Sequence, residues 1–400
     1  MATSKPPTPK IISPIFADIS LRDGLQAPGC NPLTVEERLT FAKKVMGMGV
    51  HVIEAGFAGA TKLDFEVISK ISNFKTNCII SSLARCHIKD ITAAGEALKN
   101  AKNKRIHVFI STSQIHMAAK LAMTSDEVLE AAVDGVKMAL QHTDDVQFSL
   151  EDFTRTEESF AHKVIAAVID AGAITVNLPD TVGYTTPTEY AGMISRILQN
   201  VPTAKNITLS THCHDDLGLA VANSIAAVEA GALQIECTIN GLGERAGNAA
   251  LEELAMVFKV REDHFNSRIN LDTTKLTDIS QYFAEVTGIP TAHNKAIVGL
   301  NAFRHESGIH VHGIGKNPQT YEIMTAESVG CVKSSLTIGA LSGRSGLHQH
   351  AAELGFTLSK EQVNELYDIF MEVAEKDRVS DDEFIELIKK VRGETKAKAS

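Results

Sequence analysis

The chain has 400 residues, of which 44% are hydrophobic and 22% are charged, as in ordinary globular enzymes of one large and one smaller domain, or of two or three domains. Its formal net charge of −10 argues against nucleic acid or an anionic membrane as a partner, because both attract basic proteins. No apolar run approaches the roughly 20 residues that span a bilayer. The opening residues, MATSKPPTPK, contain no apolar core of a secretory signal, which leaves a removed organelle peptide open.

The cysteines are widely scattered and form no Cys-x-x-Cys pair. In a chain of this length, that pattern predicts reduced thiols and therefore a cytoplasmic location. The residues concerned are Cys30, Cys78, Cys86, Cys213, Cys237 and Cys331.

Up to about residue 260, short apolar or β-branched runs alternate with segments that have apolar residues at helical spacing. Eight strand–helix units in about 250 residues predict an α/β fold of the (β/α)8 TIM-barrel type. A doubly wound open sheet is the alternative, but it usually has fewer strands. The predicted strands cover residues 15–18, 50–55, 78–83, 106–110, 146–150, 174–178, 207–211 and 234–239.

Helix signals support the same alternation. Helices are predicted over residues 35–48, 125–141, 157–171 and 219–230. Thr34 and Glu37 fit a capping box before the first of them. C-cap glycines are expected at Gly49, Gly172 and Gly231.

From about residue 265 the alternation stops. A helix is predicted over residues 276–287, a loop-rich stretch over 290–346, and two closing helices over 360–376 and 381–391, the first capped by Ser359. We therefore divide the chain into a catalytic barrel, residues 1–265, and an accessory linker with a small helical subdomain, residues 266–400. No C-terminal regulatory domain is expected.

Barrel enzymes place their reactive groups at the C-terminal ends of the strands. Polar residues collect at that end of strand after strand, whereas the strand interiors are almost purely apolar in the sequence. These end residues include Asp18, Asp23, Glu54, Glu151, Asp180, His212, His214 and Asn240.

His212 and His214 are separated by one residue, and on a strand such residues point to the same face. Both imidazoles can therefore bind one ion, with Asp23 adding a carboxylate from the first strand. Two imidazoles and a carboxylate with open positions suit a catalytic divalent cation such as Zn, Mn, Fe or Mg. A His-x-His pair alone also fits solvated loop histidines, but the preceding strand and the Arg-Asp-Gly segment favour the metal site.

Further candidates surround this group. Arg22 is expected to stabilise an enolate or a reacting carbonyl oxygen, or else to form a salt bridge with Asp18 or Glu54. Thr181 is expected to hold a substrate carboxylate or to cap a helix, and Glu151 to act as a base or to orient one.

Three further features complete the candidate site. Asn248 is interpreted as opening the last barrel helix, either as an N-cap or as an outer ligand of the metal. The glycine-rich loop 241–247 does not match a phosphate-binding motif and is interpreted as a tight turn above the barrel mouth. His310 is expected to act as a general base delivered by a mobile segment, with a surface histidine as the alternative.

The motifs of this sequence resemble those of the 2-isopropylmalate synthase family. That family belongs to the group of metal-dependent barrels that includes homocitrate synthase, citramalate synthase and 3-hydroxy-3-methylglutaryl-CoA lyase. The segments that carry the resemblance span roughly residues 18–345. They are LRDGLQAPG, LPDTVGY, STHCHDDLGLAVANSIAAVEAGA, ECTINGLGERAGNAALEEL, HNKAIVGLNAFRHESGIHVHG and LTIGALSGRSG.

The resemblance implies condensation of acetyl-CoA with a 2-oxo acid, foremost 2-oxoisovalerate giving 2-isopropylmalate, followed by hydrolytic release of CoA. It also implies a homodimer in which the accessory region reaches into the partner subunit. Carried over by motif, the metal ligands are Asp23, His212 and His214, with Asn248 close to the metal. The other roles are electrostatic catalysis for Arg22, substrate-carboxylate binding for Thr181, and acid/base chemistry for Glu151 and His310.

The sequence departs from the family pattern at three places. Leu25 replaces the usual Glu, as in the lyase, which leaves the 2-oxo acid open among those of 2-isopropylmalate, homocitrate and citramalate synthesis. Val311 and His312 replace the more common pair after His310. The chain also lacks room for a leucine-sensing domain, so leucine is not expected to inhibit it.

Two further readings remain. A lyase is disfavoured because GERAGNAA stands where the lyase has a catalytic cysteine. A barrel that has lost catalysis is disfavoured by the complete set of metal-binding residues.

Overall fold

The computed structural model describes residues 13–331, 335–336, 338–339, 342–376 and 379–394. It divides into two units, Met1–Thr291 and Ala292–Ser400, which are described separately below. The N-terminal decapeptide and part of the LTIGALSGRSG segment lie outside the described residues.

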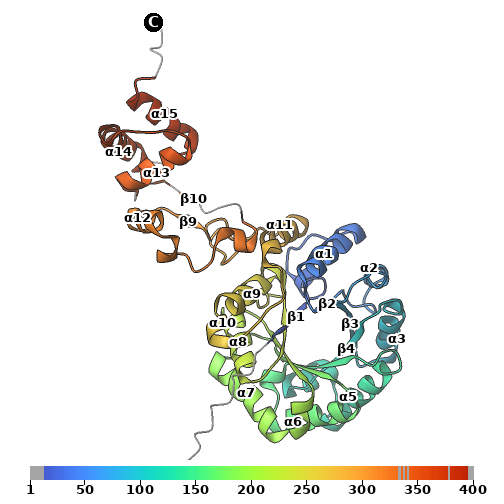
Figure 1. The fold of residues 1–400 in the computed structure, drawn as a ribbon. Helices are drawn as coiled ribbons and strands as arrows, with labels where there is room; N and C mark the ends of the chain where they lie inside the picture. The colour runs from blue at the N-terminus through green and yellow to red at the C-terminus, as the bar shows by residue number, and fades with distance from the viewer. Residues whose placement is uncertain (1–12, 332–334, 337, 340–341, 377–378, 395–400) are drawn as a thin grey trace, which may run out of the picture. The chain divides into compact units, whose positions relative to one another are not determined.

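The first unit is a closed barrel of eight parallel strands in sequential order (Figure 1). The barrel closes where Ile15 of the first strand pairs with Gln234 of the last. The TIM-barrel prediction is confirmed, and each predicted strand lies within two residues of the observed one. The strands are β1 (Ile15–Asp18), β2 (Val52–Glu54), β3 (Ile79–Arg85), β4 (Lys104–Ser111), β5 (Val146–Glu151), β6 (Thr175–Asp180), β7 (Thr208–Cys213) and β8 (Gln234–Cys237).

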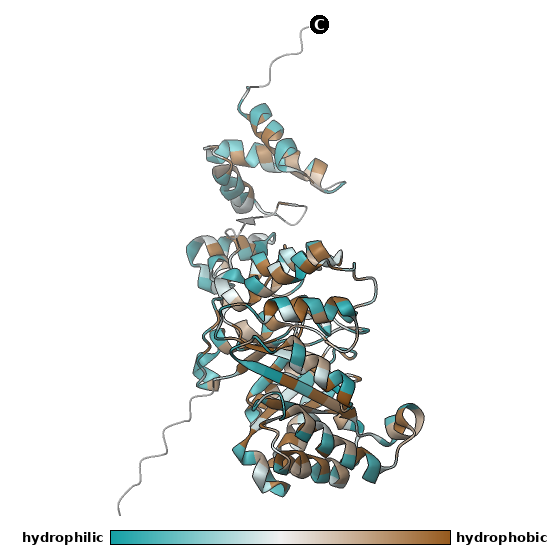
Figure 2. Ribbon diagram, turned by 90° about the vertical axis from the view of Figure 1, so that its right-hand side faces the viewer, coloured by the Kyte–Doolittle hydropathy of each residue, from teal (hydrophilic) through white to brown (hydrophobic). Residues whose placement is uncertain are grey.

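Helices surround these strands, and in Figure 2 they mix hydrophobic with hydrophilic residues, as expected when one face packs on a sheet. An additional helix, α11 (Leu276–Thr287), packs on the first through Phe41 and Phe283, whose ring centroids are 4.5 Å apart. The principal barrel helices are α1 (Val35–Met48), α2 (Lys62–Ile71), α3 (Ile88–Ala97), α5 (Ser125–Ala139), α6 (Glu158–Asp170), α7 (Pro187–Asn200), α8 (Ala220–Ala230) and α9 (Leu251–Val260).

Most of the predicted helix-end signals are confirmed. Thr34 and Glu37 form the capping box of α1, which ends at Gly49 in the left-handed conformation. Gly231 ends α8 in the same way. Gly172 has a φ of +114° but follows the C-cap residue Ala171, so it lies one position later than predicted.

The inward face of the barrel is polar, so the prediction of almost purely apolar strand interiors is wrong. His107 contacts Glu54 and Ser149, at 2.6 Å each. Arg105 donates to Gln234 over 2.6 Å. Successive strand residues face opposite sides, so this polar row alternates with an apolar row that packs under the helices. The apolar row on β4, for example, consists of Ile106, Val108 and Ile110, all buried.

The second unit contains four helices longer than one turn among its described residues, with a hydrophobic cluster that includes Leu366, Phe370 and Phe384. One of these helices, α12 (Gly308–Lys316), lies in the stretch that the sequence predicted as loop-rich, and a second, α13 (Arg344–Glu353), begins at the end of that stretch and continues beyond it. The others are α14 (Lys360–Ala374), capped by Ser359 as predicted, and α15 (Asp381–Val391). A short parallel pair joins β9 (Arg304–His305) to β10 (Ser335–Leu336).

None of the helices in the described part of the chain combines the length and the apolarity that crossing a bilayer requires.

Candidate metal centre

Two imidazoles lie at the C-terminal end of β7. His212 belongs to the strand and His214 follows its last residue, and their ring centroids are 4.9 Å apart. The backbone N–H of His214 donates to the carbonyl of Asp180 on the neighbouring strand, at 3.2 Å. Hydrogen bonding to β6 thus holds the chain at the position of the pair.

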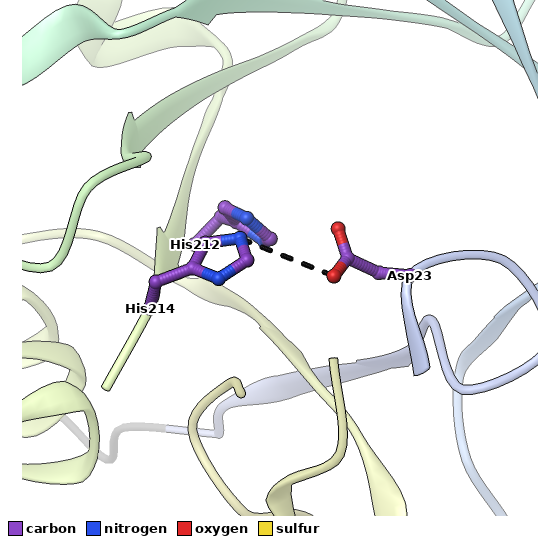
Figure 3. Close-up of side chains that lie close together, drawn as sticks. All are labelled: Asp23, His212 and His214. Carbon is purple, nitrogen blue, oxygen red and sulfur yellow. Dashed lines mark ion pairs between the residues drawn. The ribbon is translucent and has the colours of Figure 1, made fainter. Parts of the chain in front are cut away.

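Asp23 approaches the same point from the turn after β1 (Figure 3). One of its carboxylate oxygens lies 3.9 Å from Nε2 of His214. One potential ligand atom from each of Asp23, His212 and His214 lies within 4.8 Å of the others, and all three residues are buried. A buried carboxylate with two imidazoles in this arrangement could hold a metal ion.

Asn248 contacts this group but does not cap a helix, so the N-cap interpretation is wrong. α9 begins three residues later, at Leu251. The Asn248 amide donates to Asp23 over 2.9 Å and to the carbonyl of Leu242 over 3.1 Å. A Cβ at Gly243 would collide with both Asn248 and Asp23, so only glycine fits beside this pair.

The donor set suits a divalent cation. Burial lowers the pKa of His214 to about 4, and the neighbouring His212 adds to the effect. Burial alone would raise the pKa of Asp23, but Arg22, the two imidazoles and the hydrogen bond from Asn248 together outweigh it and hold that pKa well below its usual range. Neutral imidazole and ionised carboxylate are the forms that bind metals. Within the described residues, His212 Nδ1, His214 Nδ1 and Asn248 Oδ1 are buried without a hydrogen-bond partner.

Arg22 lies beside the group, held by three carboxylates. It forms ion pairs with Asp23 and, at 2.6 Å, with Glu54, and its Nη2 lies 3.8 Å from Glu236. The alternative partner Asp18 is instead bonded to Ser20, at 2.7 Å. A guanidinium fixed on two sides presents a positive charge in a defined direction.

One pocket of about 460 Å³ is lined by Arg22, Asp23, His212, His214 and Glu236. Glu151 and Thr181 line the same pocket, and so does Gln26, whereas Leu25 is absent from its described lining. Apolar side chains form part of the wall, namely Phe57, Leu83, Phe109, Pro179 and Val182. The barrel mouth therefore combines cation-binding groups with an apolar surface.

Glu151, at the end of β5, is bound by Lys120 over 2.7 Å and by the hydroxyl of Ser111. Thr181 accepts a hydrogen bond from the backbone N–H of Asp152, at 3.0 Å. It caps no helix, because the N-cap of α7 is Thr186. Both residues are thus oriented toward the pocket by other loops of the barrel.

His310 belongs to the second unit. It lies on α12, it is exposed, and its ring stacks on that of Tyr321 with 3.9 Å between the centroids.

Several residues of the pocket were not singled out from the sequence, among them Glu236 and Arg245. Glu236 lies within 3.1 Å of His212, and Arg245 forms a bidentate ion pair with Asp216 at 2.7 and 2.9 Å. The polar pair Gln234 and Glu236, two residues apart on one strand, is the signal that could have revealed the first. Arg245 could be recognised only from the fold, because its ion pair with Asp216 joins loops that follow different strands.

Comparisons with known proteins agree with this architecture. Residues 13–283 match the HMGL-like family, and residues 297–378 match the family described as homocitrate synthase post-HMGL domain-like. Solved structures of HMG-CoA lyases share the barrel fold. The one from Pseudomonas aeruginosa has a TM-score of 0.60 and 22% identity over 70% of this chain and 95% of its own, and the one from Brucella melitensis has 0.59 and 21% over 70% and 100%.

Closer similarity is found among curated relatives. The 2-isopropylmalate synthase of Rhodopirellula baltica is 50% identical over 381 residues, which cover 95% of this chain and 72% of that protein. The 2-isopropylmalate synthase of Ruminiclostridium cellulolyticum is 50% identical over 371 residues, covering 93% and 73%. The chain therefore belongs to the HMGL-like family and, within it, to the family of 2-isopropylmalate synthases.

Proposed function

We propose that this protein condenses acetyl-CoA with 2-oxoisovalerate to give 2-isopropylmalate and free CoA. The proposal rests on the observation that Asp23, His212 and His214 meet in one pocket. The chain that contains them is 50% identical to two 2-isopropylmalate synthases. Asn248 completes the proposed metal site. A divalent cation (Zn, Mn, Mg or Fe) bound there would supply a Lewis acid for the ketone of the 2-oxo acid.

The remaining pocket residues have roles that follow from their chemistry. Thr181 is proposed to donate a hydrogen bond to the carboxylate of the 2-oxo acid. Arg22 is proposed to stabilise negative charge on the reacting oxygen, because its guanidinium is permanently charged and held in place by Glu54.

Carbon–carbon bond formation needs a base and an acid. A base removes a proton from the acetyl methyl group, the resulting enolate carbon attacks the ketone carbon, and the former ketone oxygen takes up a proton. Water then hydrolyses the thioester and CoA leaves as the thiol. Glu151 is proposed as one of the two acid/base groups, since it lines the pocket and Lys120 holds its carboxylate.

His310 is proposed as the other acid/base group. Following the family resemblance, we propose that a second copy of the chain supplies it within a homodimer.

The apolar part of the pocket favours a branched side chain on the 2-oxo acid. Phe57, Leu83 and Val182 offer it an apolar surface. The arginine and lysine residues among the described lining of the pocket are already paired, Arg22 with Glu54, Lys120 with Glu151, and Arg245 with Asp216. A second carboxylate, as in 2-oxoglutarate, would therefore lack a free positive partner.

A substrate panel tests the proposal. The purified protein is assayed with acetyl-CoA and, in turn, 2-oxoisovalerate, pyruvate, 2-oxobutyrate and 2-oxoglutarate, with and without a chelator, by following release of free thiol. We expect the highest kcat/KM with 2-oxoisovalerate and loss of turnover with chelator. A preference for 2-oxoglutarate would indicate homocitrate synthesis, and a preference for pyruvate would indicate citramalate synthesis. No turnover with any 2-oxo acid would refute the proposal.

A further inference from the structure

Glu236 lies on β8 among the polar residues of the barrel interior, with its side chain 2% exposed. One carboxylate oxygen, Oε1, accepts a hydrogen bond from the amide of Gln147, at 2.6 Å. The other, Oε2, lies 3.1 Å from Nδ1 of His212 and 3.8 Å from Nη2 of Arg22. A single buried carboxylate therefore adjoins both a proposed metal ligand and the proposed electrostatic catalyst.

Hydrogen bonds from Arg105 and Gln234 fix the orientation of the Gln147 side chain. Its carbonyl oxygen accepts from Arg105 over 3.0 Å and from Gln234 over 2.9 Å. Arg105 is itself held by Asp145, at 2.7 Å. Because the carbonyl faces these donors, the Gln147 NH2 group must face Glu236, which can only be an acceptor there.

His212 Nδ1 and Glu236 Oε2 form a pair by elimination. Each atom is buried, and neither makes an aligned hydrogen bond with any described residue, yet they lie at hydrogen-bond distance. An ionised carboxylate only accepts, so this neighbour favours the tautomer with a proton on Nδ1. That tautomer leaves Nε2 unprotonated, with a lone pair for a cation.

We propose that Glu236 is a positioning residue that sets the tautomer and the ring orientation of His212 for metal binding. Histidine ligands commonly donate their second ring N–H to such a carboxylate. This inference rests on the metal centre of the proposed function. It assigns Glu236 no contact with substrate.

Glu236→Gln is the sharpest variant, because its shape is nearly unchanged. Its carbonyl would keep the bond from Gln147, which turns the new NH2 group toward His212 Nδ1. The imidazole must then accept at Nδ1 and hold its proton on Nε2, the atom needed by the metal. We expect the Kd for Co²⁺, measured by visible absorption in the chelator-treated protein, to rise about 10- to 100-fold.

Glu54→Gln is the matched control. Glu54 is an equally buried barrel carboxylate that contacts Arg22 and His107, and none of its hydrogen bonds or ion pairs among the described residues reaches His212 or His214. We expect Glu54→Gln to keep the Co²⁺ spectrum and a Kd close to the wild-type value. Melting temperatures of both variants, recorded in chelator, separate loss of metal binding from loss of folding.

The outcomes are distinct. If folded Glu236→Gln binds Co²⁺ like the wild type, or if both variants lose affinity equally, the positioning role is wrong. If Glu236→Gln does not fold, Glu236→Asp provides the test, and wild-type affinity in that shortened variant overturns the inference. If the wild-type protein itself fails to bind Co²⁺ stoichiometrically, the metal centre of the proposed function fails first.

Discussion

At the scale of single residues, the proposed metal centre contains unsatisfied buried groups. His214 Nδ1 and Asn248 Oδ1 have no hydrogen-bond partner among the described residues, and such groups are costly to bury. We expect His212→Ala to lose stoichiometric metal and nearly all turnover while the barrel stays folded. Metal analysis and circular dichroism check this, with His162→Ala on α6 as the control. Retention of metal by folded His212→Ala would contradict the assignment.

Substitution of Arg22 tests its proposed role in electrostatic catalysis. Its Nε and Nη1 contact Glu54 and Asp23, a two-sided arrangement that an ammonium group cannot reproduce. We expect Arg22→Lys to keep the metal but to lose about 10²–10³-fold in kcat, the usual effect of removing one group that stabilises developing charge. Steady-state kinetics at saturating 2-oxo acid measure this. Near-normal kcat would show that the guanidinium has no such role.

Asp18 gives the protein a pH-dependent stability. Burial raises the pKa of Asp18 to about 7, although its bond with Ser20 opposes the shift. In the unfolded chain an aspartate titrates near pH 4, so between about pH 4 and 7 the folded state binds more protons, and its contribution to stability falls as pH rises.

We therefore expect Asp18→Asn to flatten the fall in the free energy of unfolding between pH 4 and 7, and to be more stable than the wild type at pH 8. Urea denaturation across this range checks it. Asp368→Asn, at an exposed carboxylate, is the control and should leave the slope unchanged. An unchanged slope in Asp18→Asn would contradict the prediction.

At the scale of elements, the loop between β8 and α9 carries Asn248 to the site. Gly247 has a φ of +92°, and a Cβ there would collide with the carbonyl oxygen of Gly241. We expect Gly247→Ala to destabilise the protein by about 1–3 kcal/mol and to weaken metal binding, because the loop must shift. Gly29→Ala is the control, since Gly29 has a φ of +84° but open space around its Cβ.

Thermal unfolding and Co²⁺ titration of both variants distinguish the two effects. We expect Gly29→Ala to lower the free energy of unfolding by only about 1 kcal/mol, the cost of a non-glycine residue at a positive φ, and to leave the metal affinity unchanged. Equal metal affinity in the two variants would mean that this loop does not position Asn248.

At the scale of the whole molecule, the proposed homodimer predicts complementation. If His310 serves the site of the partner, then His310→Ala and His212→Ala chains are each inactive alone, but a mixed dimer has one complete site. After subunit exchange in an equal mixture, we expect up to about a quarter of wild-type activity. Exchange is verified with tagged chains. Verified exchange without recovered activity would show that His310 does not act across subunits.

The local sequence determined the barrel and the three central residues of the site. Eight apolar runs, helix caps such as Thr34 and Gly49, and polar groups at strand ends all depend on short-range spacing, which a sequence displays directly. His212 and His214 share a face because they are two residues apart on a strand. Asp23 could be assigned from the rule that strand ends meet at one mouth.

Only the tertiary structure decided which residues fill the barrel and which surround Asp23, His212 and His214. Glu236 was invisible as a partner of His212 because the two lie on different strands, and only barrel closure brings them within 3.1 Å. Spacing alone left Asn248 open between a helix cap and a neighbour of the metal, because its distance from Asp23 depends on a folded loop. Helix α12 was not predicted because its sequence, rich in glycine and histidine, does not repeat apolar residues at helical spacing. Contacts between distant segments arise from three-dimensional packing, which spacing along the chain does not encode directly.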